Sequence, residues 1–361
     1  MRQSLGQLLR RAAVGVLSLA VVWAPCGSAN AAPAAPAPEA DGLSFAQRYH
    51  ALQHGGIVRA ANASATCRTT ASSCRDARAG ANAANGDFDM TYIDVDRDPN
   101  TYNSSRAEVA LPAGSRVTYA RLYWGGNLLA GEQKPWQDNG RVLIAEPGGE
   151  YKELLADTLV GHRVADGADA FQASADVTEL VRDSAPGLYT VAQVNVAMGR
   201  SAAGTWGGWT LVVAYENAAE PLRHLALWDG FAPLGGRSGV EMPLRNLPFA
   251  AGAGGRAGLV AYNGDRGTDG DSLVLTADES APAALADRAN PSDDVLNSTI
   301  TDAGTAPARV PSYANTLGYD SDVFDLSGGL PRAGDRAVLR LTSQRDAAWA
   351  GVLFAAVDAR R

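Results

Sequence analysis

Residues 188–215 read LYTVAQVNVAMGRSAAGTWGGWTLVVAY, and this stretch decides the fold class. It contains two runs rich in β-branched and aromatic residues, LYTVAQVNVAM and GWTLVVAY, separated by a segment with glycine and serine. Such runs favour β-strands, and the glycines favour turns between them. We therefore expect two strands here, with Trp209 in the more apolar run packed into a core.

The same pattern continues on both sides of this stretch. Upstream, the strand-like runs are MTYIDV, AEVAL, RVTYARLYW, RVLIAE and YKELLADTLV; downstream, they are HLALWDGF, GLVAYNGD, SLVLTA, AVLRLTSQ and AGVLFAAVD. Short helices are expected over Leu43–Gln53 and near Asp176–Arg182, where an aspartate precedes an apolar turn. Many short strands separated by turn residues predict an all-β fold of two packed antiparallel β-sandwich or jelly-roll-like lobes.

The N-terminus predicts export. Arg2, Arg10 and Arg11 precede an apolar run and a small-residue A-x-A site that ends at Ala31, the order found in a cleavable signal peptide. An N-terminal membrane anchor is the alternative, but the apolar run is shorter than the roughly 20 residues that span a bilayer. We expect a signal peptide at 1–31, a Pro/Ala-rich linker at 32–45, an irregular disulfide-bonded segment at 46–84, and β-sandwich lobes at 85–217 and 218–361.

Charge and cysteine content fit an exported protein. The formal net charge is −8, and an acidic surface repels phosphate backbones, so nucleic acid is not expected as a partner. Cys67 and Cys74 remain after removal of the leader, and in an oxidising compartment we expect them to form a disulfide. A pair of metal-binding thiolates is the alternative, but no further ligands stand nearby at zinc-like spacing.

Seven segments in order carry a resemblance to a known family: NGDFDMTYIDVD from Asn85, LPAGSRVTYARLYWGG from Leu111, GGWTLVVAYEN from Gly207, LWDGF from Leu227, GDSL from Gly270, NSTI from Asn297 and NTLGYDSDVFD from Asn315. The set resembles an uncharacterised group of secreted, mostly actinobacterial proteins known only as a domain of unknown function. The resemblance implies an extracellular β-rich domain that often occurs in cell-surface proteins. It implies no activity and no catalytic residue.

Catalytic signals in the sequence are weak. A serine hydrolase needs a nucleophile, a base and an orienting acid, and the chain has no G-x-S-x-G motif. Paired carboxylates could still serve a glycosidase, because aspartates are plentiful. We therefore expect a non-enzymatic binding or structural protein, secreted or attached to the cell envelope, that takes a carbohydrate or a protein surface. A secreted hydrolase acting on glycans is the alternative.

Three acidic runs are candidate calcium sites, because calcium takes six to eight oxygen ligands. The first holds Asp94, Asp96 and Asp98, the second Asp320 and Asp322 followed by Asp325, and the third Asp265, Asp269 and Asp271. None has the full EF-hand pattern, and each run taken alone fits a solvated turn better than a calcium site. Calcium is the one cofactor that the sequence suggests.

Trp136 is the best candidate for an exposed aromatic contact with a ligand. It lies in the polar segment EQKPWQDNG, and exposed aromatic rings on a β-sandwich can pack against sugar rings. The alternative is that Trp136 fills part of the core.

Overall fold

Strand β2 (Leu43–Ala63) is the longest strand and joins the two halves of the fold. Its first part pairs with β13, from Leu43 to His54, and its second part pairs with β12, from Gly55 to Ala63.

The computed structural model describes residues 35–40, 42–70, 72–96, 98–235, 239–278, 280–327 and 330–360. The predicted signal peptide lies outside these residues.

One large sheet has β2 near its middle. Its eleven strands, in spatial order, are β1 (Glu39–Ala40), β9 (Thr158–Ala165), β10 (Ala168–Asp176), β6 (Arg116–Asn127), β12 (Gly207–Glu216), β2, β13 (Leu222–Pro233), β22 (Trp349–Asp358), β15 (Gly255–Tyr262), β20 (Tyr319–Asp325) and β18 (Ile300–Asp302). Most neighbours are antiparallel, and parallel pairs occur at the two edges.

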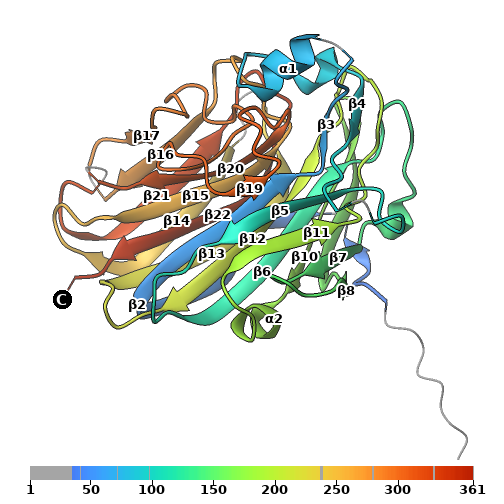
Figure 1. The fold of residues 1–361 in the computed structure, drawn as a ribbon. Helices are drawn as coiled ribbons and strands as arrows, with labels where there is room; N and C mark the ends of the chain where they lie inside the picture. Colours follow the sequence, from blue (N-terminus) through green and yellow to red (C-terminus); the bar gives the residue numbers. More distant parts are fainter. Residues whose placement is uncertain are drawn as a thin grey trace, which may run out of the picture. The chain divides into compact units, whose positions relative to one another are not determined.

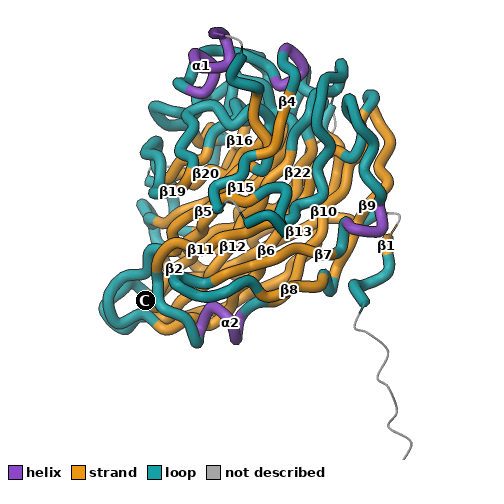
Figure 2. The backbone as a smooth tube through the Cα atoms, turned by 45° about the vertical axis from the view of Figure 1, so that its right-hand side comes forward, coloured by secondary structure: helices purple, strands orange, loops and turns teal. Residues whose placement is uncertain are grey.

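Two smaller sheets pack against this sheet, as Figures 1 and 2 show. The first contains β19 (Arg309–Val310), β5 (Ser104–Val109), β11 (Gly187–Ala192), β7 (Arg141–Ala145) and β8 (Lys152–Leu155), and the second contains β14 (Gly239–Phe249), β21 (Gly334–Thr342), β16 (Ser272–Ala277) and β17 (Ala283–Leu285). A short pair, β3 (Ala65–Cys67) and β4 (Met90–Tyr92), lies near α1 (Ser72–Arg78). Among the described residues, the other helical segments are α2 (Thr178–Arg182) and the 3-10 turns Asn85–Asp87 and Trp136–Asp138.

Three main apolar cores hold these layers together. One, with Trp124 and Trp209, lies between β6, β12 and the five-stranded sheet; another, with Leu353, lies between β22, β15 and the four-stranded sheet. Trp209 is completely buried, as expected. β12 and β22 of the large sheet are buried along nearly their whole length, whereas β14 alternates buried and exposed residues. The packed layers form an all-β sandwich fold, which confirms the predicted class.

The third core joins the two halves of the large sheet. It contains Trp206 and Tyr262, whose rings lie 5.8 Å apart. Gln172 of β10 donates a hydrogen bond to the Gly230 carbonyl at 2.8 Å and accepts one from the Tyr262 hydroxyl at 3.0 Å. Because β10 and β15 are far apart in the strand order, these contacts require the two halves of the sheet to curl toward each other.

The N-terminal segment differs from the sequence-based expectation. Residues 43–53 form a strand rather than a helix, and 46–84 is not irregular, because it holds most of β2, all of β3 and α1. The alanines and glutamines of Leu43–Gln53 favour a helix, but the segment alternates along one strand and pairs with β13 throughout its length. The expected lobes 85–217 and 218–361 thus share β2, and residues 35–361 form one compact unit.

Candidate binding groove

A groove of about 600 Å³ crosses the large sheet, and its lining comes from the consecutive strands β12, β2, β13, β22, β15, β20 and β18. The apolar residues of its lining include the buried Ile57 and Ala356 and the more exposed Leu111 and Pro112. Gly56 has a structural reason to be glycine, because a Cβ atom there would lie 2.9 Å from the Tyr215 hydroxyl oxygen. The missing side chain lets the ring of Tyr215 lie close to the backbone of β2 at Gly56.

Charged side chains on the groove wall are already paired with one another. Nη1 of Arg256 contacts both carboxylate oxygens of Asp302, at 2.8 and 2.9 Å. Arg223 contacts Glu220 at 3.0 Å and also Asp358 at 2.9 Å. Each arginine is therefore held in a fixed position, with donors left over for a ligand.

Asp325 completes the polar lining of the groove. Its carboxylate accepts hydrogen bonds from the backbone N–H of Ser327, at 2.7 Å, and from the hydroxyl of the same serine. The serine hydrogen bonds lower the pKa of Asp325, so this carboxyl is ionised at neutral pH. A general acid needs a raised pKa instead. The other two carboxylates of the groove, Glu220 and Asp302, contact arginines.

The first acidic run forms a turn stabilised by its own hydrogen bonds. Asp96 accepts hydrogen bonds from the Asp98 backbone at 2.8 Å, from Thr101 at 3.1 Å and from the Tyr151 hydroxyl. Asp94 instead accepts from Ser104 at 2.9 Å. Throughout the described ranges, no three His, Cys, Asp or Glu side chains stand in an arrangement that could hold a metal ion. Calcium binding by Asp94, Asp96 and Asp98 stays a prediction.

The tertiary structure brings the second and third acidic runs together. Asp320 and Asp322 of β20 are completely buried, and Asp271, directly before β16, is buried beside them. We call the full group the buried aspartate cluster; its members are Asp265, Asp271, Asp294, Asp320, Asp322 and Asp346. Asp294 and Asp346 were not singled out from the sequence, because neither lies in a run of alternating aspartates: Asp294 follows Asp293 directly, and Asp346 is a single aspartate.

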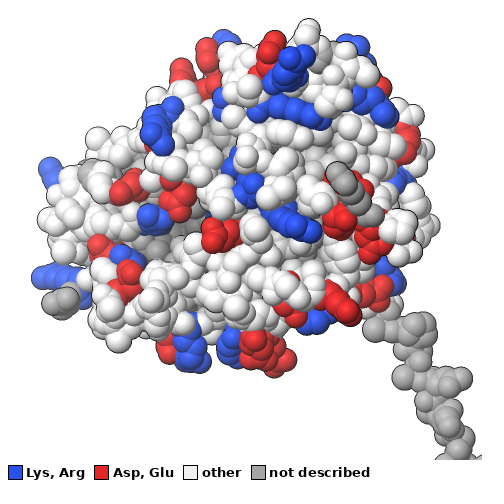
Figure 3. Space-filling model, viewed as in Figure 1, with Lys and Arg blue, Asp and Glu red and all other residues white. Residues whose placement is uncertain are grey.

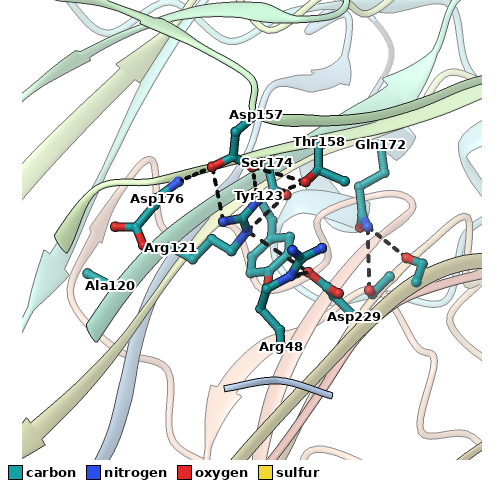
Figure 4. A network of polar contacts seen from close by, with 12 residues as sticks. Arg48, Ala120, Arg121, Tyr123, Asp157, Thr158, Gln172, Ser174, Asp176 and Asp229 are labelled. Atoms are coloured by element: carbon teal, nitrogen blue, oxygen red, sulfur yellow. Dashed lines mark hydrogen bonds and ion pairs between the residues drawn. The ribbon is translucent and has the colours of Figure 1, made fainter. Parts of the chain in front are cut away.

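A second buried polar group, the Asp229 network, links the two halves of the large sheet (Figure 4). Asp229 on β13 is 2 % exposed and accepts hydrogen bonds from Arg48 at 2.8 Å and from Tyr123 at 3.0 Å. Arg121 lies 3.9 Å from the same carboxylate and also pairs with Asp157. Burial, with Asp229 nearby, raises the pKa of Tyr123 well above its usual value, so its hydroxyl remains a donor. These contacts connect β13 with β2 and β6 and hold the three strands in register.

The remaining predicted residues lie apart from the groove lining. Trp136 is 45 % exposed, in the 3-10 turn Trp136–Asp138, as expected from its polar surroundings. Cys67 and Cys74 form a disulfide, with Cα atoms 5.7 Å apart, which confirms the predicted pairing. Sequence reasoning missed Arg223, Arg256 and Asp302, because they come from three strands with no common spacing.

No protein-family model matches the chain, and no curated protein matches it. The resemblance to a family of secreted actinobacterial proteins therefore stays a prediction. Among solved structures, a chain from the atomic structure of Sulfolobus Turreted Icosahedral Virus is 11 % identical, with 84 % of this chain and 91 % of that chain covered and a TM-score of 0.20. A TM-score this low carries no argument about function. No helix in the part of the chain described here is long and apolar enough to span a bilayer.

Proposed function

We propose that this chain is an exported binding protein whose groove takes a neutral, polyhydroxylated ligand, with an extracellular carbohydrate as the best fit. The observation that carries the proposal is the pairing of Arg256 with Asp302, and of Arg223 with Glu220, in a groove whose lining also contains apolar residues. The signal-like N-terminus supports export, and the Cys67–Cys74 disulfide fits an oxidising compartment.

The charge balance of the groove favours a neutral ligand. Its lining has two arginines and three carboxylates, so neither sign dominates. A strongly anionic or cationic ligand would meet side chains of its own sign in the lining and would compete with the partners within the ion pairs. A polyol can instead donate to the carboxylates and accept from the arginines while both pairs stay intact. On the face seen in Figure 3, acidic and basic side chains likewise lie next to one another in small groups.

The state of the groove carboxylates favours binding over hydrolysis. A glycosidase keeps one carboxyl protonated as the general acid, usually by apolar surroundings that raise its pKa. In the groove, Asp302 and Glu220 contact arginines, and the pKa of Asp325 is lowered. We therefore expect a bound glycan to be released unchanged, without new reducing ends.

A glycan screen with the mature protein, beginning at Ala32, tests this function. A glycan that binds should then be titrated by calorimetry against Arg256→Gln and Asp302→Asn. Each variant removes half of one groove pair, and we expect at least tenfold weaker binding. Arg340→Gln is the matched control, because Arg340 is an exposed arginine that pairs with Glu241 outside the groove lining.

Two results would count against the proposal. One is that no glycan binds to the mature protein; the other is that a glycan binds to both groove variants with the same affinity as to the wild type.

Export is checked separately by N-terminal sequencing of protein from the culture medium. We expect a first residue of Ala32, and retention of Arg10 would refute cleavage.

A further inference from the structure

The groove lies at one end of the curled part of the large sheet. Asp325 and Asp302 are the last residues of β20 and β18. Arg223 and Arg256 are the second residues of β13 and β15. Because most neighbouring strands are antiparallel, the end of one strand lies beside the start of the next. The charged residues of the groove therefore meet at one end of the run of strands from β12 to β18.

The two sides of this run of strands are joined to each other across the third core. Arg59 on β2 donates hydrogen bonds to the carbonyl oxygens of Thr301 on β18 and of Ser321 on β20, the latter at 2.6 Å. On the neighbouring strand β12, the hydroxyl of Thr210 forms a hydrogen bond with that of Tyr319 on β20 at 2.7 Å. The strands β12 and β2 therefore meet β20 and β18, and the sheet curls into a barrel-like ring.

The loop after β5 closes the remaining side of the ring. Asn62 on β2 donates hydrogen bonds to the carbonyl oxygens of Arg106 on β5 and of Val310 on β19, both at 3.0 Å. β19 follows β18 along the chain and pairs with β5. β5 is followed by Leu111 and Pro112, which belong to the groove lining. The groove is thus the open end of a ring rather than a channel between two parallel walls.

The inner end of the groove is closed by the third core. Ile57 and Ala356 line the groove and also belong to that core, where Val212 and Phe354 are 1 % exposed. A barrel of about eight strands is only wide enough for side chains to fill its interior, and this ring has seven strands. A ligand chain cannot pass through the ring, so it enters and leaves by the same opening.

This shape decides which part of a glycan fits. An internal unit of a chain continues into a further sugar on both sides, whereas a terminal unit continues on one side and carries free hydroxyl groups around the rest of its edge. The ion pair of Arg223 lies on β13 and that of Arg256 on β15, with β22 between them. Two strand spacings, about 10 Å, leave room for one sugar ring between these ion pairs.

We propose that the groove binds the terminal unit of a glycan chain, end-on. The proposal rests on the proposed function and adds to it which part of the glycan is recognised. The terminal unit lies among the polar side chains of the ring, the second unit lies at the opening, and further units extend into solvent. The affinity per chain therefore stops increasing at about the second unit.

A series of chain lengths tests this inference. The mature protein is titrated with α- and β-glucan, xylan, mannan, galactan and chitin, each from the monosaccharide to the hexasaccharide and as the long polysaccharide. For a glycan that binds, we expect the Kd per chain to stop falling at the disaccharide. We also expect the polysaccharide to compete in proportion to its chain ends, and hence far less per unit mass than the hexasaccharide.

Two ways of attaching the binding glycan to a surface distinguish its two ends. Attachment through the reducing end presents only the non-reducing end, and the reverse attachment presents only the reducing end. We expect binding to one of the two surfaces, which identifies the end that is recognised. Equal binding to both surfaces would show that units within the chain are recognised and would overturn the inference.

Variants on opposite sides of the ring give an independent measurement. Glu220→Gln and Asp302→Asn should each weaken binding about tenfold, by the same factor for the disaccharide and the hexasaccharide, because both remove charge-assisted contacts to the same unit. Arg340→Gln, outside the groove lining, is the matched control and should bind as the wild type does. If a groove variant does not fold, the length series of the wild type decides.

The possible failures are distinguishable. If no member of the panel binds, the proposed function is wrong, and end-on recognition is wrong with it. If a glycan binds and its Kd per chain keeps falling up to the hexasaccharide, or the polysaccharide competes equally per unit mass, the groove binds glycans but not by their ends. A loss of affinity in Asp302→Asn for the hexasaccharide alone would likewise show that the chain lies across the groove.

Discussion

At the scale of single residues, the buried carboxylate of Asp229 is stabilised by the side chains that contact it. Asp229 is 2 % exposed and contacts Arg48 and Tyr123, with Arg121 nearby. Asp229→Ala would remove the carboxylate that Arg48 and the buried Tyr123 contact and would leave the buried Arg121 with Asp157 as its acidic partner, so we expect a loss of about 3 kcal/mol in the free energy of unfolding. Urea denaturation at pH 6 measures this loss.

The matched comparison is Asp157→Ala, which removes the other carboxylate bound to Arg121. The side chain of Asp157 is 48 % exposed, so water can replace it, and we expect a loss of only about 1 kcal/mol. Equal losses in the two variants would mean that the Asp229 network does not tie the halves of the sheet together.

At the scale of elements, β2 changes partners between His54 and Gly55. Gly55 has a φ of +145°, and a Cβ atom there would lie 1.9 Å from the carbonyl oxygen of Tyr215. Because that neighbour is backbone, Gly55→Ala should force β2 and β12 apart and lower the free energy of unfolding by about 3 kcal/mol or more. Denaturant unfolding and hydrogen exchange along β2 measure the effect.

Gly148→Ala is the control that separates the cost of a positive φ from the cost of a steric clash. Gly148 also has a positive φ, of +74°, but a Cβ atom there would meet nothing within 4 Å. We expect Gly148→Ala to cost about 1–2 kcal/mol. If Gly55→Ala costs no more than this control, the partner change in β2 tolerates a side chain and our account of the junction is wrong.

At the scale of the whole molecule, the shared strand should make the described unit unfold cooperatively. Both halves of the large sheet use β2 and meet in a common core around Trp206 and Tyr262. Opening one half would expose that core to water, so we expect one urea transition rather than two. Coincident curves from tryptophan fluorescence and far-UV circular dichroism would support this; two separate transitions would show that the lobes are independent.

Most strands could be predicted from sequence because their signal is local. GWTLVVAY and RVTYARLYW alternate or concentrate β-branched residues over the length of a strand, and they became β12 and β6. The local signal of residues 43–53 was misleading. Their alanines and glutamines favour a helix, and pairing with β13 overrides that preference. The groove was unpredictable for a similar reason, since Arg223, Arg256 and Asp302 meet only when three strands are side by side.

The sequence by itself determined the all-β class, the Cys67–Cys74 pair and the burial of Trp209, because each depends on residue type and short spacing. Only the tertiary structure decided that acidic runs far apart in the chain form one cluster, that β2 unites the two lobes, and that paired charges line one groove. The physical reason is that strand pairing is non-local: side-chain alternation fixes which face a residue occupies, but the choice of neighbouring strand depends on packing of the entire chain.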